Sequence, residues 1–299
     1  MALFFALPGN EQLASELAAL TCSELGELEL RHFPDGETYV RILSDVRRRD
    51  VFMVCTLARP DAQFVPLCFA AAAIQQLGAQ SVQLIAPYLA YMRQDRIFHP
   101  GEALTSRLFA ELLQQHFDRL ITVDPHLHRH ASLGEVYDIP TTVVHAAPLF
   151  AQWITAHVHQ PIIVGPDAES AQWVRSIAQQ VGAPWTIFEK DRRGDRDVRV
   201  SARSLTDAAG RTPVLTDDIV SSGATMKQAL GILTSHDLPP AYCLAIHALC
   251  SRRTARQLSD KSVEFLTSNT IPNASAALDV APLIAHSIAS EAAAKTYAA

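Results

Sequence analysis

The strongest constraint on the fold is an alternation of short apolar runs with longer segments of helical periodicity along the 299 residues. Runs such as PIIVG and FMVCTL suit strands that are buried on both faces, and strands that alternate with helices form parallel sheets flanked by helices. The expected strands are Leu3–Leu7, Val51–Thr56, Val82–Ala86, Leu120–Val123, Ile162–Val164, Thr186–Phe188, Val214–Leu215 and Tyr242–His247. The expected helices are Glu11–Ala19, Phe64–Leu77, Ser106–His116, Ser170–Val181 and Met226–Ser235. The sequence therefore predicts an α/β protein.

The strand and helix pattern runs twice, with a junction near residues 143–148. In each half one apolar strand leads directly to aspartate, in LITVDPH and in PVLTDDI. The length also suits about two domains. We therefore expect two similar α/β domains, residues 1–145 and 146–299, with the last helix free to pack back onto the first domain.

Composition limits the classes of partner and compartment. The formal net charge of -6 disfavours nucleic acid, which usually calls for a basic face. The five cysteines are scattered and form no CxxC pair, so we expect a reducing, cytoplasmic location. The start, MALFFALPGN, has no basic region typical of a signal peptide, and the apolar stretches are shorter than the about 20 residues that span a bilayer. No membrane partner is expected.

Acidic residues follow several of the expected strands. Asp124 follows ITV, Asp167 follows IIVGP, and Asp217 and Asp218 follow PVLT. In open parallel sheets, ligands bind beyond the carboxyl ends of the strands. The sequence therefore predicts a polar binding site at these ends.

The segment Val214–Thr225, VLTDDIVSSGAT, has a strand, two acids and a turn of small residues that leads into a helix. Backbone N–H groups of such a turn can close around a phosphate, helped by the helix N-terminus, and the acids suit sugar hydroxyls or hydrated Mg²⁺. The alternative is an ordinary helix N-cap. The candidate residues are Asp217, Asp218, Ser221, Ser222, Gly223, Ala224 and Thr225.

This segment resembles the phosphoribosyl-diphosphate motif of phosphoribosyltransferases and of ribose-phosphate pyrophosphokinases. The resemblance implies two phosphoribosyltransferase-type domains and a loop that binds ribose 5-phosphate. Ser221 stands where many members have Asp, and Ser222 stands where most have Thr. The hydroxyl at 222 keeps a donor, whereas the change at 221 removes a carboxylate that could anchor a hydroxyl.

Two further segments distinguish these families. HFPDGETYV, by itself, predicts a hairpin turn with Gly36 at positive φ. It also resembles the Phe-x-Asp-Gly-Glu loop of the pyrophosphokinases, which implies an adenine pocket that contains Phe33, Asp35 and Glu37.

PYLAYMRQD is similar to the Pro-Tyr-x-x-Tyr-x-Arg-Gln-Asp segment of the pyrophosphokinases. The resemblance implies that Arg93, Gln94 and Asp95 bind ATP. An Arg side chain can pair with phosphate oxygens through its planar fork. For Tyr88 and Tyr91 we favour packing in the core over contact with the nucleotide.

The metal ligands are expected in VDPHLHRH and VGPD. The alternating histidines alone would also fit a zinc hydrolase, but further ligands form no clear pattern downstream. The segments resemble the family's Val-Asp-Leu-His, with Pro125 in place of Leu, and its x-x-Pro-Asp. The resemblance implies Mg²⁺ at His126 and Asp167, and it gives no role to His128 or His130, for which we expect an exposed loop.

IFEKDRRG alone would be a solvated basic loop. It resembles a mobile loop of the family that closes over the transferring group, which implies catalytic roles for Lys190 and Arg192. Asp191 departs from the pattern, because a basic residue is common there.

The resemblance as a whole implies a ribose-phosphate pyrophosphokinase that uses Mg²⁺, ATP and ribose 5-phosphate. It also implies a homo-oligomer, a dimer or a multiple of dimers, because the Phe-Asp-Glu loop of the family reaches into a neighbouring subunit. The segment RIFHPGEALTS looks like that of the shorter archaeal-type enzymes. The alternatives are a phosphoribosyltransferase, which FPDGE and RQD disfavour, and a non-catalytic regulatory homologue.

Overall fold

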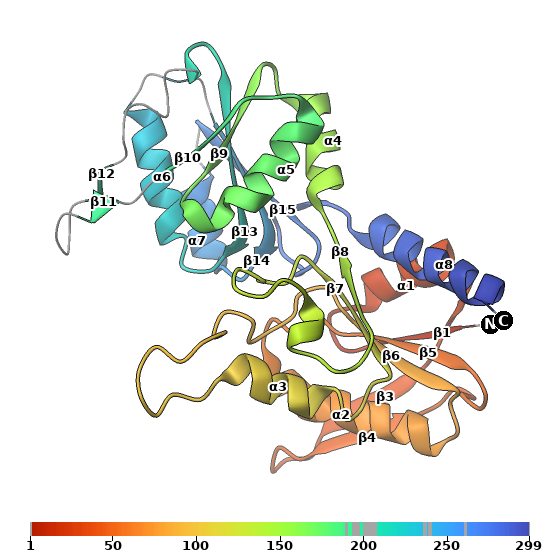
Figure 1. Ribbon diagram of the computed structural model, residues 1–299. Coiled ribbons are helices and arrows are strands. Elements are labelled where there is room, and N and C mark those ends of the chain that lie inside the picture. Colours follow the sequence, from red (N-terminus) through yellow and green to blue (C-terminus); the bar gives the residue numbers. More distant parts are fainter. Residues whose placement is uncertain are drawn as a thin grey trace. The chain divides into compact units, whose positions relative to one another are not determined.

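The computed structural model describes residues 2–188, 191–192, 198–199, 208–235, 238, 241–259 and 262–298 (Figure 1). The chain divides into two compact units. The first unit contains Met1–His145 together with Ala281–Ala299, and the second contains Ala146–Val280. The polypeptide therefore enters the second unit once and then returns to the first.

A six-stranded parallel sheet forms the centre of the first unit, in the order β2-β1-β5-β6-β7-β8. Its strands are β1 (Leu3–Ala6), β2 (Glu24–Leu25), β5 (Asp50–Val54), β6 (Ser81–Ala86), β7 (Arg119–Val123) and β8 (Thr141–Val144). The apolar side chains of β1, β5, β6 and β7 are mostly buried, which is typical of a parallel sheet covered on both faces, whereas Leu25 of the edge strand β2 is exposed.

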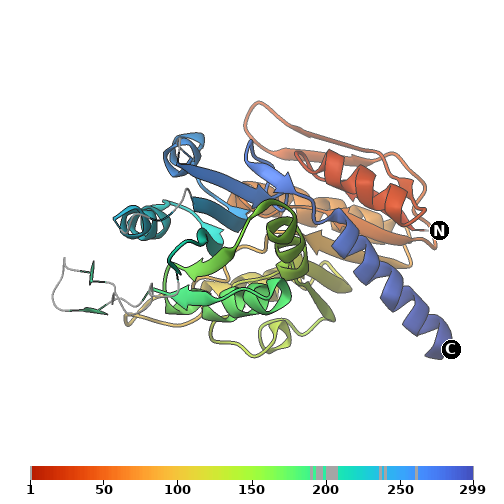
Figure 2. The ribbon, with the colours of Figure 1, turned by 90° about the horizontal axis from the view of Figure 1, so that it is seen from above.

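The helices of the first unit are α1 (Glu11–Leu20), α2 (Pro60–Gln76), α3 (Thr105–Leu113), α8 (Ala281–Ala298) and the short η1 (Leu133–Glu135). Helix α1 buries Leu13 and Leu17, and it packs against α8, the last helix of the chain (Figures 1 and 2). Helix α8 also contacts β8, and Ile284 and Ala285 are buried. The chain's last helix is therefore part of the first unit.

An antiparallel hairpin, β3 (Leu28–His32) and β4 (Thr38–Ile42), packs against α2. Its turn is closed by Phe33 N–H, which donates to the carbonyl of Glu37 at 2.8 Å. Gly36 has φ +94°, which confirms the predicted turn with a glycine at positive φ.

The second unit has its own six-stranded parallel sheet, in the order β10-β9-β13-β14-β15-β16. The strands are β9 (Pro161–Gly165), β10 (Trp185–Ile187), β13 (Thr212–Val220), β14 (Ala241–Ala248), β15 (Val263–Ser268) and β16 (Ala276–Leu278). The helices are α4 (Ala147–His157), η2 (Ala168–Ser170), α5 (Ala171–Val181), α6 (Ala224–Thr234) and α7 (Arg252–Leu258). A small antiparallel pair joins β11 (Asp191–Arg192) to β12 (Val198–Arg199).

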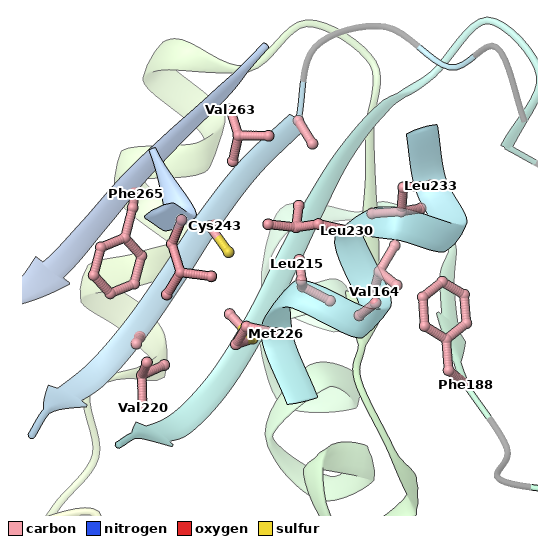
Figure 3. Packing of buried hydrophobic residues seen from close by; sticks show 14 of the residues in the cluster. Val164, Phe188, Leu215, Val220, Met226, Leu230, Leu233, Cys243, Val263 and Phe265 are labelled. Atoms are coloured by element: carbon pink, nitrogen blue, oxygen red, sulfur yellow. The ribbon is translucent and has the colours of Figure 1, made fainter. Parts of the chain in front are cut away.

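The core of the second unit anchors α6 on the sheet. Met226 and Leu230 of α6 lie over Leu215 of β13 and Cys243 of β14, as Figure 3 shows. All four side chains are buried, and full burial of such a side chain contributes about 1.5–3 kcal/mol. This packing fixes the point where α6 begins, directly after the turn of small residues.

The structure extends the predicted strand around Leu215. Strand β13 continues to Val220, and Asp217 pairs with Ala245 of β14, so both acids lie inside the strand and not after it. Pairing with β14 continues past the acids through Ile219 and Val220, and Asp218 N–H donates to Asp217 Oδ1 at 3.0 Å, so backbone groups in this stretch have partners. Among the described helices, none has the length and hydropathy needed to span a bilayer.

Candidate active site

The turn of small residues joins the end of β13 to the start of α6. Gly223 is the N-cap of α6 with φ +72°, and Ala224 N–H donates to Ser222 Oγ at 3.3 Å. Ser222 and Ala224 are exposed, whereas Gly223 is buried. The first N–H groups of a helix have no partner within the helix, so this end of α6 can bind an anion.

Helix α7 packs against this turn at Gly223. A Cβ atom at Gly223 would lie 2.7 Å from Thr254 Cγ2 and 3.4 Å from Leu258 Cδ1. Thr254 is fixed by the cap of α7, where its N–H donates to Ser251 Oγ at 3.1 Å. Glycine is therefore required both by the positive φ and by the close approach of α7.

We expect Gly223→Ala to lower the free energy of unfolding by about 2–4 kcal/mol, because it adds left-handed strain and an overlap with Thr254. Urea unfolding would measure the loss. The double variant Gly223→Ala/Thr254→Ser should recover part of it, because serine lacks the methyl group that overlaps but keeps the hydroxyl. Equal stability of the single and double variants would contradict the overlap with α7.

Three carboxylates lie near the carboxyl ends of adjacent strands in the second unit. Asp217 and Asp218 belong to β13, and Asp167 follows β9, which pairs with β13. Burial raises the pKa of Asp217 well above its usual value, and the charges of Asp218 and Asp167 raise it further. Such a group of carboxylates favours a bound proton, a cation or the hydroxyls of a sugar.

Local hydrogen bonds hold Asp167 in place. Its Oδ1 accepts from Glu169 N–H at 3.1 Å, and its carbonyl accepts from Ser170 Oγ at 2.6 Å. A Cβ at Gly165, the last residue of β9, would overlap the Ser170 side chain. The missing side chain at 165 therefore allows η2 to fold against the end of β9.

The corresponding end of the first unit carries a pair that the sequence reasoning missed. Asp124 follows β7 with φ +32°, and its Oδ1 lies 2.8 Å from Nδ1 of His145, which follows β8. This hydrogen bond raises the pKa of His145 above its usual value. Asp124 was selected because it follows an expected strand. His145 also follows an apolar strand, so the same rule could have found it.

The predicted metal residue His126 lies on the loop after β7. Its ring centroid is 3.8 Å from that of His128, and the two rings are nearly perpendicular. His130 Nδ1 instead lies 3.1 Å from Glu135 Oε2. The loop thus places His128 beside His126 and turns His130 toward η1.

The segment after β6 contains the predicted ATP residues. Arg93 is exposed, and Gln94 Oε1 accepts from the Thr105 hydroxyl at 2.9 Å. Asp95 is buried, and Nη1 of Arg129 donates to both of its carboxylate oxygens, at 2.7 and 2.9 Å. Arg93 is therefore the residue of this segment that is best placed to meet a ligand.

The two tyrosines of the same segment differ in how deeply they are buried. Tyr88 is buried, and the Tyr91 ring lies 4.7 Å from the ring of Phe109. Tyr91 has φ +62° and its hydroxyl donates to Asp61. Core packing is confirmed for Tyr88, whereas Tyr91 is half-buried and packs its ring against Phe109 at the edge of the core.

The tip of the β3–β4 hairpin presents the predicted adenine residues. Phe33, Asp35 and Glu37 are exposed, and Asp35 Oδ1 accepts from Glu37 N–H at 3.1 Å. The Arg31 guanidinium lies over the rings of Phe33 and Tyr39, 4.7 and 4.2 Å from their centroids. One face of Phe33 therefore already packs against a cation.

The predicted catalytic residues, Lys190 and Arg192, lie in or beside an internal gap in the described residues. Lys190 lies outside the described residues. The backbone of Arg192 belongs to β11 and pairs with Val198, but its side chain is also outside the described part.

Comparisons with known proteins agree with this geometry. Residues 2–116 match the N-terminal domain of ribose phosphate pyrophosphokinase, and residues 132–283 match the phosphoribosyl transferase domain. These matches define a protein built from two domains of the phosphoribosyltransferase type, as predicted.

Similar proteins identify the family more closely. The ribose-phosphate pyrophosphokinase of Methanopyrus kandleri is 33% identical, over 93% of this chain and 94% of the relative. The enzyme of the same name from Saccharolobus solfataricus is 33% identical, over 85% and 88%. The crystal structure of phosphoribosylpyrophosphate synthetase from Mycobacterium smegmatis matches with a TM-score of 0.84 at 25% identity, over 96% of this chain and 98% of that one. The chain belongs to the ribose-phosphate pyrophosphokinase family, transferases of nucleotide biosynthesis.

Proposed function

We propose that this chain transfers the β,γ-pyrophosphoryl group of Mg-ATP to the C1 hydroxyl of ribose 5-phosphate, which yields phosphoribosyl diphosphate and AMP. The observation that carries the proposal is membership of the family over most of the chain. The partly exposed turn before α6 and the carboxylates of β13 supply a fitting site for a phosphorylated sugar.

The sugar phosphate is assigned to the second unit. Backbone N–H groups of the turn 221–224 and the hydroxyls of Ser222 and Thr225 bind the 5-phosphate, because these donors surround the N-terminus of α6. Asp217 and Asp218 accept hydrogen bonds from the ribose hydroxyls. Their position in β13, just ahead of the turn, supports this assignment.

The nucleotide is assigned to exposed residues of the first unit. The free face of the Phe33 ring stacks on adenine, and Asp35 and Glu37 accept from its amino group or from nearby donors. Arg93 pairs with phosphate oxygens. Gln94 and Asp95 shape the segment that carries Arg93, as their hydrogen bonds indicate.

His126 in the first unit and Asp167 in the second are assigned as Mg²⁺ contacts. Burial raises the pKa of Asp217, and the charges of Asp218 and Asp167 raise it further; this group of carboxylates supports a cation in the second unit. When bound, Mg²⁺ neutralises charge on the phosphate oxygens.

Reactions of this type require alignment and charge neutralisation more than covalent catalysis. The turn before α6 holds the acceptor so that its C1 hydroxyl attacks the β-phosphorus. Lys190 and Arg192 stabilise the charge that develops on the transferred group and on the departing AMP.

We assign the ATP residues to a first domain and the ribose 5-phosphate residues to a second, with a boundary close to residues 145–146. The active form is a homo-oligomer, a dimer or a multiple of dimers, in which the exposed hairpin tip serves a neighbouring subunit. All five cysteines are free thiols, which fits the reducing cytoplasm.

The direct test measures nucleotide products. AMP should form only when ATP, Mg²⁺ and ribose 5-phosphate are all present, and phosphoribosyl diphosphate should accumulate in equal amount. Chromatography of the nucleotides, with one component omitted at a time, would measure this. ADP as the main product would indicate a simple kinase and would contradict the pyrophosphoryl transfer.

A further inference from the structure

The carboxylate of Asp95 is fully buried, although Arg93 and Arg96 on either side of it in the sequence are exposed. Its partner, Arg129, comes from a different loop. Asp95 follows β6, whereas Arg129 lies on the loop after β7, three residues beyond His126. The ion pair therefore joins the loops that follow two adjacent strands of the first sheet.

The arginine is also packed against the same segment. Its guanidinium carbon lies 6.0 Å from the centroid of Phe98, and that of Arg96 lies 4.5 Å from the same ring. The Arg129 side chain is 37% exposed, and its Nη1 contacts both oxygens of Asp95. Arg129 thus fills the space between the buried acid and the aromatic ring.

A buried carboxylate without a cation is strongly unfavourable, so it either takes up a proton or moves to reach water. Loss of Arg129 would therefore displace Asp95 or change its charge. Arg93 lies two residues earlier, and the Gln94 carbonyl and side chain are tied to the start of α3 through Ser106 N–H and the Thr105 hydroxyl. A shift at Asp95 would consequently change the position of Arg93.

We propose that Arg129 is a positioning residue for ATP. Through its ion pair with Asp95, it holds the segment that carries Arg93 in a fixed position relative to the loop that carries His126. The inference rests on the proposed function, since it takes Arg93 as the phosphate contact. Misplacement of a binding group by about 1 Å can lower a rate on the order of 10²-fold. The arrangement therefore predicts a large effect from a residue that does not touch the substrate.

The experiment compares Arg129→Met with Arg129→Lys and with a matched control. Arg129→Met should lower kcat/KM for ATP by about 10²-fold and leave the KM for ribose 5-phosphate unchanged. Arg129→Lys should lie between wild type and Arg129→Met, because it keeps the charge but not the planar fork. Arg47→Met removes the arginine of an exposed pair with Asp45 and should have no effect.

A double variant tests the route through Asp95. Once Asp95→Asn has removed the buried charge, Arg129→Met should reduce kcat/KM much less than it does in wild type. Equal effects of Arg129→Met in both backgrounds would overturn the proposed route. An unchanged kcat/KM for ATP in folded Arg129→Met, or an equal rise in both KM values, would also overturn the inference.

Calorimetric binding of Mg-ATP gives a readout that does not depend on turnover. The affinity should fall in Arg129→Met and stay unchanged in Arg47→Met. If wild type binds ATP but forms no AMP, the proposed function fails, and the calorimetric comparison still decides whether Arg129 positions the nucleotide segment.

Discussion

Replacement of Lys190 by alanine is expected to lower kcat by roughly 10²–10³-fold, the usual effect of removing one preorganised donor to a transition state. Both KM values should stay nearly unchanged, because the assigned charge develops only as the pyrophosphoryl group transfers. Steady-state kinetics with each substrate varied in turn would separate the two constants. Arg192→Ala should give a loss in kcat of the same kind.

The matched control for this variant is Lys227→Ala. Lys227 lies on α6, where its Nζ donates to Gln257 of α7 at 2.5 Å, so its removal deletes a lysine charge from another element of the same unit. We expect the control to keep its activity. A near-normal kcat in Lys190→Ala would show that the basic loop is only a solvated surface.

The Lys190→Ala variant also tests whether active sites are shared between subunits. A protein with Asp35→Ala and Glu37→Ala should be nearly inactive alone, because it lacks the acceptors assigned to adenine. After subunit exchange with Lys190→Ala, some sites would contain one intact hairpin tip and one intact Lys190. Activity should then recover in the mixture. A fully active monomer in light scattering would contradict a site built from two chains.

Asp217→Asn is expected to stabilise the protein while it weakens the binding of ribose 5-phosphate. The pKa of Asp217 is raised in the folded state by burial and by its acidic neighbours, so folding disfavours the ionised form. The raised pKa of Asp217 therefore adds to the free energy of unfolding at low pH, where the carboxyl is protonated. This contribution is lost as the pH rises through the raised pKa. Asparagine stays neutral and can still accept from Asp218 N–H, so the variant should unfold at higher urea concentration near pH 7.

Although Asp217→Asn should stabilise the fold, it should weaken the binding of ribose 5-phosphate. A hydrogen bond to a charged group contributes about 1.5–3 kcal/mol, so the KM for ribose 5-phosphate should rise by roughly 10- to 100-fold. Asp138→Asn is the control, because Asp138 is exposed in the first unit and should affect neither quantity. Normal binding of ribose 5-phosphate by Asp217→Asn would contradict the assignment of Asp217 to the sugar site. Unfolding of the variant at a lower urea concentration would show that the carboxylate stabilises the fold.

Much of the fold could be predicted because buried parallel strands consist mostly of apolar residues. The segments around Phe4, Met53, Leu84, Ile121 and Ile163 were placed within a few residues of the observed strands. Strands β8 and β16 were missed. They are short edge strands, and their sequences, TTVV and AAL, lack a long apolar run. Strand β15, VEFLTS, was also missed because polar residues interrupt its pattern.

The candidate site was predictable where polar residues stand at the ends of strands, as at Asp124 and Asp167. The role of Asp95 was harder to predict, because only a long-range contact reveals that its carboxylate is buried against Arg129. Likewise, the need for glycine at 223 comes from Thr254, thirty-one residues later in the chain. Pattern and spacing report local structure, whereas these constraints depend on tertiary packing.

The return of α8 to the first unit affects how the protein is made on the ribosome. Domains generally fold as units while the chain emerges, the N-terminal one first. Here every strand of the first sheet emerges before the second unit, but α8, the helix that packs beside α1, is made after the whole second unit. The second unit consists of contiguous chain and can close as soon as Val280 has emerged. The first unit begins folding earlier but is completed later, and until then the surface of α1 that contacts α8 remains open to chaperones.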